Sequence, residues 1–233
     1  AFVYSSCVYD MDELISGVSS ELAGVPLIGN TSFTGIITGD GFITSDQGFV
    51  GIMAISDPDL AVGVAGKARG EDPVEDGKIL AVEAMKAAGK STPPTYFYMA
   101  ASPAEEEFYL KGISSVVGRV PLFGGSAADN SISGEWKLYT ENGSFANGAV
   151  IAFFYGNPIT NMFTGAYRET DDFGVITKID GNRSLVEIDG IPATKKYAKW
   201  AGVTKEAVTG GNLLVTTITS PLGVKDRLGD LIA

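Results

Sequence analysis

The sequence predicts an α/β protein of the mixed-sheet α+β type, in which a β-α-β unit is duplicated, extended by antiparallel strands and covered by helices. Three observations predict this fold class. Apolar residues make up 45% of the chain and charged residues 19%, a mixture typical of a globular core. Strand-like and helix-like segments alternate along the chain. Residues 15–29 also resemble residues 110–124 at one constant spacing. The identical positions are Gly17, Ser19, Ser20, Val25, Pro26, Leu27 and Gly29, which recur as Gly112, Ser114, Ser115, Val120, Pro121, Leu122 and Gly124.

The first copy, about residues 1–90, begins with an apolar strand at Phe2–Ser6. Asp10 followed by Glu13 predicts the start of a helix, because an acidic cap and an acid three residues later bind free backbone N–H groups. A second apolar strand at Val25–Ile28 ends in glycine. A short β-α-β connection of this kind predicts parallel pairing of the two strands. Further strands are expected at Ile36–Thr38, Gly41–Thr44, Phe49–Ile55 and Leu60–Val64, and a helix at Val74–Ala88.

The second copy, about residues 95–170, repeats this order. A strand is expected at Tyr96–Ala101. Ser102, Pro103 and Glu105 predict the cap, the first turn and the capping acid of the next helix. The following apolar strand, at Val120–Phe123, again ends in glycine. Further strands are expected at Trp136–Thr140, Ala149–Tyr155 and Met162–Ala166.

The remaining residues predict a different arrangement. Two runs, Val175–Ile179 and Ser184–Ile188, indicate a hairpin over the turn at residues 180–182, and Ala193–Trp200 indicates a helix. The last residues read as a loop leading into an unfinished strand, so we expect the chain to be truncated at this end.

The charge of the chain argues against two classes of partner. Twenty-eight acidic and seventeen basic residues give a formal charge of −11. This charge repels a phosphate backbone and an anionic membrane surface. No apolar run approaches the roughly 18 residues of a membrane span. We expect neither nucleic acid nor a membrane as a partner, and the sequence does not predict an oligomeric state.

The chain contains no histidine. This excludes Ser-His-Asp and Cys-His catalytic sites, paired-histidine zinc sites and a proximal-histidine haem. The single cysteine, Cys7, has no disulfide partner within the chain, and we interpret it as a structural thiol in a reducing compartment. Acidic clusters at residues 10–13 and 105–107 fall in first turns of predicted helices, where they offset the helix dipole. We expect no catalytic residue, metal or cofactor.

Two short polar segments that follow the glycine-ended strands are the candidate ligand-binding site. Ligands of open α/β sheets collect beyond the carboxyl ends of strands, where glycine exposes backbone N–H groups and small polar side chains offer hydrogen bonds. The alternative is that the glycines form tight turns and the hydroxyls cap the backbone. The candidate ligand-binding residues are Asn30, Thr31, Ser32, Gly124, Gly125, Ser126, Asp129 and Asn130.

The order of these segments resembles the FIST domain family. The resemblance rests on residues 25–32 and 120–129, each a Pro-apolar-Gly strand end followed by small polar residues, and on the Gly-led apolar strand at residues 148–151. Residues 186–193, Tyr197 and residues 220–223 are similar to the start of the companion FIST C-terminal region. The resemblance therefore implies a FIST N-terminal region at residues 1–183, which holds both repeated units, and a truncated start of the FIST C-terminal region at residues 184–233. Asn30 stands where many relatives have cysteine, which excludes thiol chemistry at that position.

The resemblance implies a cytoplasmic sensory domain of a signal transduction protein that binds a small molecule, with an amino acid or a similar polar metabolite as the expected ligand. A signalling output domain or protein is the implied partner. Haem sensing, proposed for some relatives, conflicts with the absence of histidine. Two other functions stay open at this point: a hydrolase or transferase that works without histidine, and a protein-interaction scaffold.

Overall fold

The computed structural model of the protein describes residues 1–162, 167–181, 183–210, 212–225 and 231–232. The chain divides into two compact units, residues 1–161 and residues 162–233. Mixed sheets with helices packed on them confirm the predicted fold class. No helix among the described residues is both long enough and apolar enough to cross a membrane.

The first sheet of unit 1 has five strands, and β1 lies next to its centre. β1 pairs in parallel with β2 and antiparallel with β5, and β2 pairs antiparallel with β9. In spatial order the strands are β10 (Gly143–Phe145), β9 (Leu138–Thr140), β2 (Ile28–Thr31), β1 (Phe2–Ser5) and β5 (Val50–Met53).

The second sheet of unit 1 has four strands. β7 pairs in parallel with β8 and antiparallel with β11, which also pairs antiparallel with β6. Both parallel pairings that the β-α-β steps predict are therefore present. In spatial order the strands are β6 (Ala61–Ala68), β11 (Gly148–Tyr155), β7 (Tyr96–Ala101) and β8 (Leu122–Ser126); a separate hairpin consists of β3 (Ile36–Thr38) and β4 (Gly41–Ile43).

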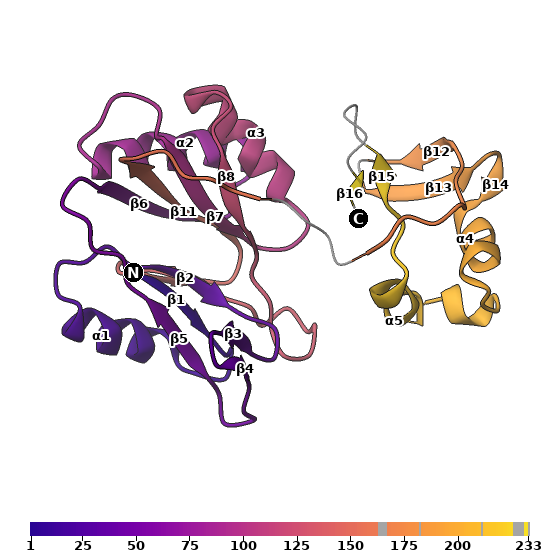
Figure 1. Cartoon of the computed structure of the whole chain (residues 1–233), viewed down its shortest axis with the longest axis horizontal. Coiled ribbons are helices and arrows are strands. Elements are labelled where there is room, and N and C mark those ends of the chain that lie inside the picture. The colour runs from indigo at the N-terminus through magenta and orange to yellow at the C-terminus, as the bar shows by residue number, and fades with distance from the viewer. Residues whose placement is uncertain (163–166, 182, 211, 226–230, 233) are drawn as a thin grey trace. The chain divides into compact units, whose positions relative to one another are not determined.

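Unit 1 is built in four layers (Figure 1). The helix α1 (Met11–Glu21) covers the outer face of the first sheet through Ile15 and Val18. The helices α2 (Pro73–Ala87) and α3 (Glu106–Val117) cover the outer face of the second sheet. The inner faces of the two sheets pack against each other. Their shared core consists of Phe2, Ile28, Tyr98, Ala100, Ala127, Leu138, Val150, Ala152 and Phe154.

Strands from each half of the sequence pair with the sheet of the other half. β6 follows the first β-α-β step along the chain but pairs with β11 in the second sheet. β9 and β10 follow the second step but pair onto β2 in the first sheet. This exchange ties the halves together, so neither sheet forms from one continuous half of the chain.

Most predicted elements of unit 1 are confirmed. Asp10 caps α1, because its Oδ1 accepts hydrogen bonds from the backbone N–H groups of Asp12 at 2.9 Å and Glu13 at 3.1 Å. The predicted helix at 74–88 is α2, shifted by one residue, and the predicted strand at 96–101 is β7. The predicted strand Met162–Ala166 lies mostly outside the described residues.

The predicted cap of α3 is wrong. The helix begins at Glu106, four residues after Ser102. The Ser102 hydroxyl instead accepts a hydrogen bond from the backbone N–H of Gly148 at 3.2 Å and lies 3.3 Å from the carbonyl oxygen of the same residue. Ser102 thus continues the pairing of β7 with β11, and this long-range contact replaces the local capping bond.

The predicted ends of β2 and β8 are also wrong. Both strands begin later than expected and continue through the glycine into the polar residues, to Thr31 in β2 and Ser126 in β8. The reason is the parallel ladder, which pairs Ser5 with Thr31 and Ala101 with Ser126. Part of each predicted loop is therefore strand.

A close crossing of α2 and α3 depends on two glycines. A Cβ atom added to Gly112 would lie 2.0 Å from the carbonyl oxygen of Val74. A Cβ atom added to Gly77 would lie 2.3 Å from the carbonyl oxygen of Tyr109. The two helices therefore approach at a distance that no larger residue permits at these positions.

The described residues of unit 2 form a three-stranded sheet, a two-stranded sheet, two α-helices and a short 3-10 helix. The predicted hairpin is present as β12 and β13, and the predicted helix as α4. The Tyr197 hydroxyl of α4 donates a hydrogen bond to the carbonyl oxygen of Ser220 at 2.7 Å. The elements are β12 (Ile176–Asp180), β13 (Ser184–Ile188), β14 (Ile191–Pro192), α4 (Ala193–Ala201), the 3-10 helix η1 (Glu206–Val208), α5 (Asn212–Thr219), β15 (Val224–Lys225) and β16 (Leu231–Ile232).

Candidate functional site

A cavity of about 580 Å³ lies between the two sheets of unit 1, at the carboxyl ends of their parallel strands. This volume is in the range of small-molecule sites. Both predicted polar segments contribute to it. The cavity is lined by Tyr4 from β1, Asn30 from β2, Ser32 and Phe33 after β2, Tyr98 from β7, Phe123, Gly124, Gly125 and Ser126 from β8, and Ala128.

The floor of the cavity is an uncharged hydrogen-bond network. The Tyr98 hydroxyl donates to Asn30 Oδ1 at 2.9 Å, and the Asn30 side-chain N–H donates to the carbonyl oxygen of Thr31 at 2.9 Å. Burial raises the pKa of Tyr98 far above its ordinary value, and the neighbouring Tyr4 adds to the shift. The phenol therefore stays protonated and continues to donate to Asn30.

Tyr139 supports this floor from the other face of the first sheet. Its hydroxyl lies 2.9 Å from the Ser5 hydroxyl and 3.1 Å from the carbonyl oxygens of Val3 and Asn30. Burial raises the pKa of Tyr139 as well. Because the ring packs over Gly29, where an added Cβ atom would lie 2.3 Å from it, the backbone of Asn30 is held in place.

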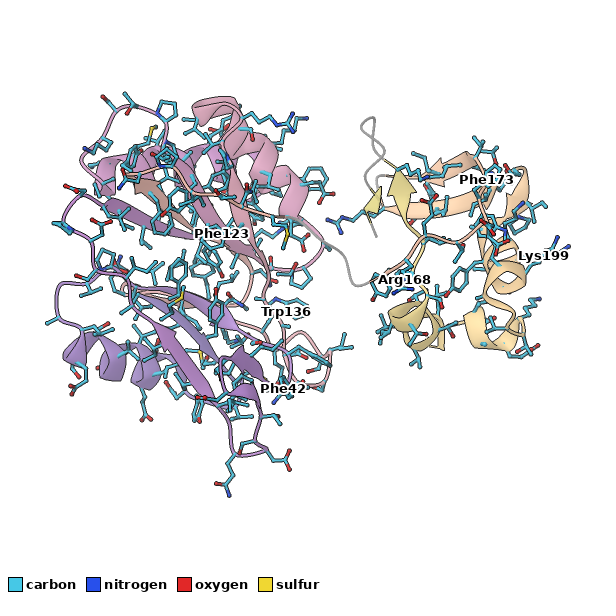
Figure 2. All side chains as sticks on the ribbon, in the orientation of Figure 1. Phe42, Phe123, Trp136, Arg168, Phe173 and Lys199 are labelled. Atoms are coloured by element: carbon cyan, nitrogen blue, oxygen red, sulfur yellow. The ribbon has the colours of Figure 1, made fainter. Side chains whose placement is uncertain are left out.

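Two phenylalanines form the apolar part of the lining. Figure 2 shows Phe123 between the two sheets, and its ring lies 5.3 Å from the Tyr98 ring and 6.1 Å from the Phe2 ring. Phe123 is nevertheless 38% exposed, and Phe33 is 52% exposed. Their exposed faces offer apolar contact to a molecule that enters the cavity.

The paired glycines of β8 have different roles. Gly124 adopts φ +148°, and an added Cβ atom would lie 1.8 Å from the carbonyl oxygen of Met99, so only glycine fits the close pairing with β7. A Cβ atom added to Gly125 meets no atom within 4 Å. Gly125 therefore leaves open space on the cavity side of the strand.

Three of the predicted residues do not line the cavity. The Thr31 hydroxyl is buried and accepts a hydrogen bond from the backbone N–H of Lys137 at 2.9 Å, which joins β2 to the segment before β9. Asn130 Oδ1 accepts from the backbone N–H of Thr34 at 3.2 Å. These contacts position the two polar segments relative to each other.

Asp129, the third, is 2% exposed and organises the loop at residues 129–135. Burial alone would raise its pKa, but hydrogen bonds from backbone N–H groups outweigh burial and lower the pKa. Its two carboxylate oxygens accept from the N–H groups of Ser131, Ile132, Ser133, Gly134 and Glu135.

Sequence reasoning missed the four aromatic lining residues. Tyr4 and Tyr98 lie in predicted strands, and alternation along the strand places each on the face shared with the core. Phe123 was predicted within a strand, and Phe33 follows the first polar segment directly. All four residues lie close in sequence to the predicted polar residues, and this could have identified them as candidates. Which aromatic rings line the cavity, however, depends on how the two sheets pack face to face.

Other features of the described residues offer no comparable site. A second cavity, at the amino end of β1, has a volume of about 60 Å³ and is lined mainly by apolar residues. It has room for little more than water. Among the described residues, no group of three or more acidic, cysteine or histidine side chains could hold a metal ion. Cys7 is half-buried and free.

We expect Tyr98→Phe to lower the free energy of unfolding by about 1 kcal/mol, the usual contribution of a buried hydrogen bond. The variant removes the donor to Asn30 Oδ1 and keeps the ring. Chemical denaturation of purified protein measures the change. Tyr155→Phe is the matched control, because the Tyr155 hydroxyl bonds to the carbonyl oxygen of Thr92 in an exposed position. Equal losses in both variants would contradict the structural role of the Tyr98–Asn30 bond.

Comparison with known proteins bears on unit 1 and the first part of unit 2. A family model, described as the FIST N domain, matches residues 1–191. A comparison with curated proteins gave no match.

Proposed function

The chain belongs to the FIST N domain family, and on this premise we propose that it binds a small polar metabolite in the inter-sheet cavity and reports its concentration to a signalling partner. FIST domains are sensory domains. One observation supports the proposed site above all others. Polar residues from the ends of β2 and β8, more than 90 residues apart in sequence, line one open cavity.

The position of the cavity supports a sensory mechanism. A ligand there contacts β1 and β2 of one sheet and β7 and β8 of the other. A molecule that bridges two packed layers binds best at one spacing of those layers, and it thereby favours one of two conformations. We further propose that an output domain or a separate signalling protein responds to this conformational change. We also propose that the protein is located in the cytoplasm, because the free thiol of Cys7 favours a reducing compartment.

The expected ligand is an amino acid or a similar polar metabolite, and the protein is not an enzyme in this proposal. The chain has no histidine, and the lining offers hydroxyl, amide and backbone groups for binding. Residues 184–233 are proposed to begin the companion FIST C-terminal region, after a first region at residues 1–183. The match to the FIST N domain ends at residue 191, just before α4 begins at Ala193.

A cavity-filling variant tests the site. We expect Gly125→Leu to fold normally, because its Cβ meets no atom within 4 Å, and to lose ligand binding, because the added side chain occupies the cavity. A thermal-shift screen against amino acids and other metabolites gives the measurement, with a saturable rise in melting temperature expected for the unsubstituted protein.

Gly17→Leu is the matched control, since a Cβ atom at Gly17 also meets no atom within 4 Å and Gly17 lies on α1, away from the cavity. This control should keep the ligand-induced shift. A saturable shift that survives unchanged in Gly125→Leu would place the ligand elsewhere. Turnover of a screened compound would instead favour a hydrolase or transferase that works without histidine.

A further inference from the structure

The chemistry of the cavity lining restricts the class of ligand that the cavity takes. This inference rests on the proposed ligand-binding function. Among the described residues that line the cavity, none carries a charged side chain. An ionised group that leaves water without a counter-charge costs several kcal/mol. The lining therefore disfavours a ligand with a free ammonium or carboxylate group inside the cavity. Of the two ligands proposed above, it favours an uncharged polar metabolite over a free amino acid.

Three of the four side-chain hydroxyls of the lining, all except that of Tyr4, already donate to groups of the protein. Ser32 Oγ donates to the carbonyl oxygen of Gly35 at 2.7 Å, and Ser126 Oγ donates to Glu106 Oε1 at 2.5 Å. The Tyr98 hydroxyl donates to Asn30. Glu106 is the one charged group that these contacts bring next to the lining. Besides the Tyr4 hydroxyl, a ligand must therefore find hydrogen-bond donors mainly in the backbone.

The backbone of β8 supplies such donors. β8 is the edge strand of its sheet within the described part of the chain. The backbone N–H of Phe97 donates to Pro121 O at 3.1 Å, and that of Ala127 donates to Ala101 O at 2.9 Å. In a parallel ladder alternate residues pair with the neighbouring strand. Odd-numbered residues 121–127 thus pair with β7, so the N–H and C=O groups of Gly124 and Ser126 face away from it.

An edge of this kind binds a group that offers one acceptor and one donor side by side, as an added strand does. The C=O and N–H of one trans amide point in opposite directions, so the smallest neutral group with that pattern is a single amino-acid residue with an amide on each side. Phe33 and Phe123 present partly exposed rings to the same cavity, and an aromatic group packs well against them. We propose that the ligand is an uncharged molecule in which a residue with an aromatic side chain carries an amide on each side.

A matched series of phenyl compounds tests the proposal. The neutral probe is N-acetyl-phenylalanine amide; the charged probes with the same ring are phenylalanine, 3-phenylpropionate and 2-phenylethylamine. Isothermal titration with the full chain measures each Kd. We expect the neutral amide to bind at least tenfold more tightly than each charged probe. N-acetyl-N-methyl-phenylalanine dimethylamide, a neutral probe that lacks every N–H donor, is expected to lose about tenfold in affinity.

Gly125→Leu separates failure of this inference from failure of the proposed function. Neutral-amide binding that Gly125→Leu abolishes supports both. Equal or tighter binding of a charged probe, abolished by Gly125→Leu, overturns the ligand class and leaves the function standing. No binding of the neutral amide at millimolar concentration also overturns the ligand class. If no probe and no metabolite gives a signal sensitive to Gly125→Leu, the proposed function fails.

Discussion

The variant Gly112→Ala is expected to lose about 2 kcal/mol of unfolding free energy, whereas Gly17→Ala gains about 1 kcal/mol. The two glycines occupy the same position of the repeated sequence, in α3 and α1. Alanine is better than glycine in a helix by about 1 kcal/mol, so both variants share that gain. Their difference comes from what surrounds them.

Gly112 touches another helix and Gly17 does not. A Cβ atom at Gly112 would lie 2.0 Å from Val74 O and 2.9 Å from Gly77 Cα, both backbone atoms that cannot rotate away. α2 and α3 must then separate, and overpacking of this kind costs about 3 kcal/mol. A Cβ atom at Gly17 meets no atom within 4 Å. The repeated glycine is therefore essential in one copy only.

Thermal unfolding compares the two variants directly. For a domain of this size about 1 kcal/mol corresponds to roughly 2–4 °C, so Gly112→Ala should melt about 4–8 °C below the unsubstituted protein and Gly17→Ala about 2–4 °C above it. Gly77→Ala, on the facing helix, should resemble Gly112→Ala. Equal melting temperatures for Gly17→Ala and Gly112→Ala would show that α2 and α3 do not cross as closely as described.

The variant Asp129→Ala is expected to lose about 3 kcal/mol of unfolding free energy, since it removes the charged acceptor of several part-buried backbone hydrogen bonds in one loop. The carboxylate accepts from Gly134 N–H at 2.7 Å and Glu135 N–H at 2.8 Å, among others. The loop at 129–135 includes Ile132 at φ 58°, a conformation that a non-glycine residue rarely adopts unless its surroundings hold it. Without the carboxylate, the backbone N–H groups of this loop lose their acceptor, and we expect the loop to leave this conformation.

Because the Asp129 carboxylate is ionisable, we expect its contribution to the free energy of unfolding to depend on pH. The pKa of Asp129 is lower in the folded protein than its ordinary value of 3.8. A lowered folded pKa means that the ionised carboxylate stabilises the fold above the unfolded pKa, and that this contribution disappears as pH falls through the folded pKa. The stability gap between the unsubstituted protein and Asp129→Ala should therefore be full at pH 7 and shrink below about pH 4.

Urea denaturation at pH 7 and at pH 3 measures this gap. Asp10→Ala is a suitable control, because Asp10 accepts backbone N–H groups at an exposed helix start and its loss should cost only about 1 kcal/mol. A gap for Asp129→Ala that stays constant from pH 7 to pH 3 would contradict the ionised loop-organising role.

The local features of this protein can be predicted from short stretches of its sequence. Apolar runs predicted β1 and β7, Asp10 predicted the start of α1, and the short β-α-β connections predicted parallel pairing of β1 with β2 and of β7 with β8. These features depend on a few neighbouring residues and on the handedness of the connection. The absence of histidine excluded whole classes of chemistry with no structure at all.

The candidate site was predicted in part. Asn30, Ser32, Gly124, Gly125 and Ser126 line the cavity, because strand ends of two β-α-β steps meet where the sheets face each other. The aromatic residues of the lining were not predicted. Their role depends on which side chains cross from one sheet to the other, and strand alternation alone does not show this.

Three features cannot be predicted from short stretches of sequence: which strands pair across the halves, what Asp129 binds, and which of the two repeated glycines is needed. β9 pairs onto β2 and β6 onto β11 because backbone groups at open sheet edges find partners far away in sequence. In the same way, Ser102 bonds to the backbone of Gly148 instead of capping α3. Gly17 and Gly112 share a repeated motif, but only α3 has another helix packed against its glycine. These features depend on long-range packing, which cannot be seen in a local sequence pattern.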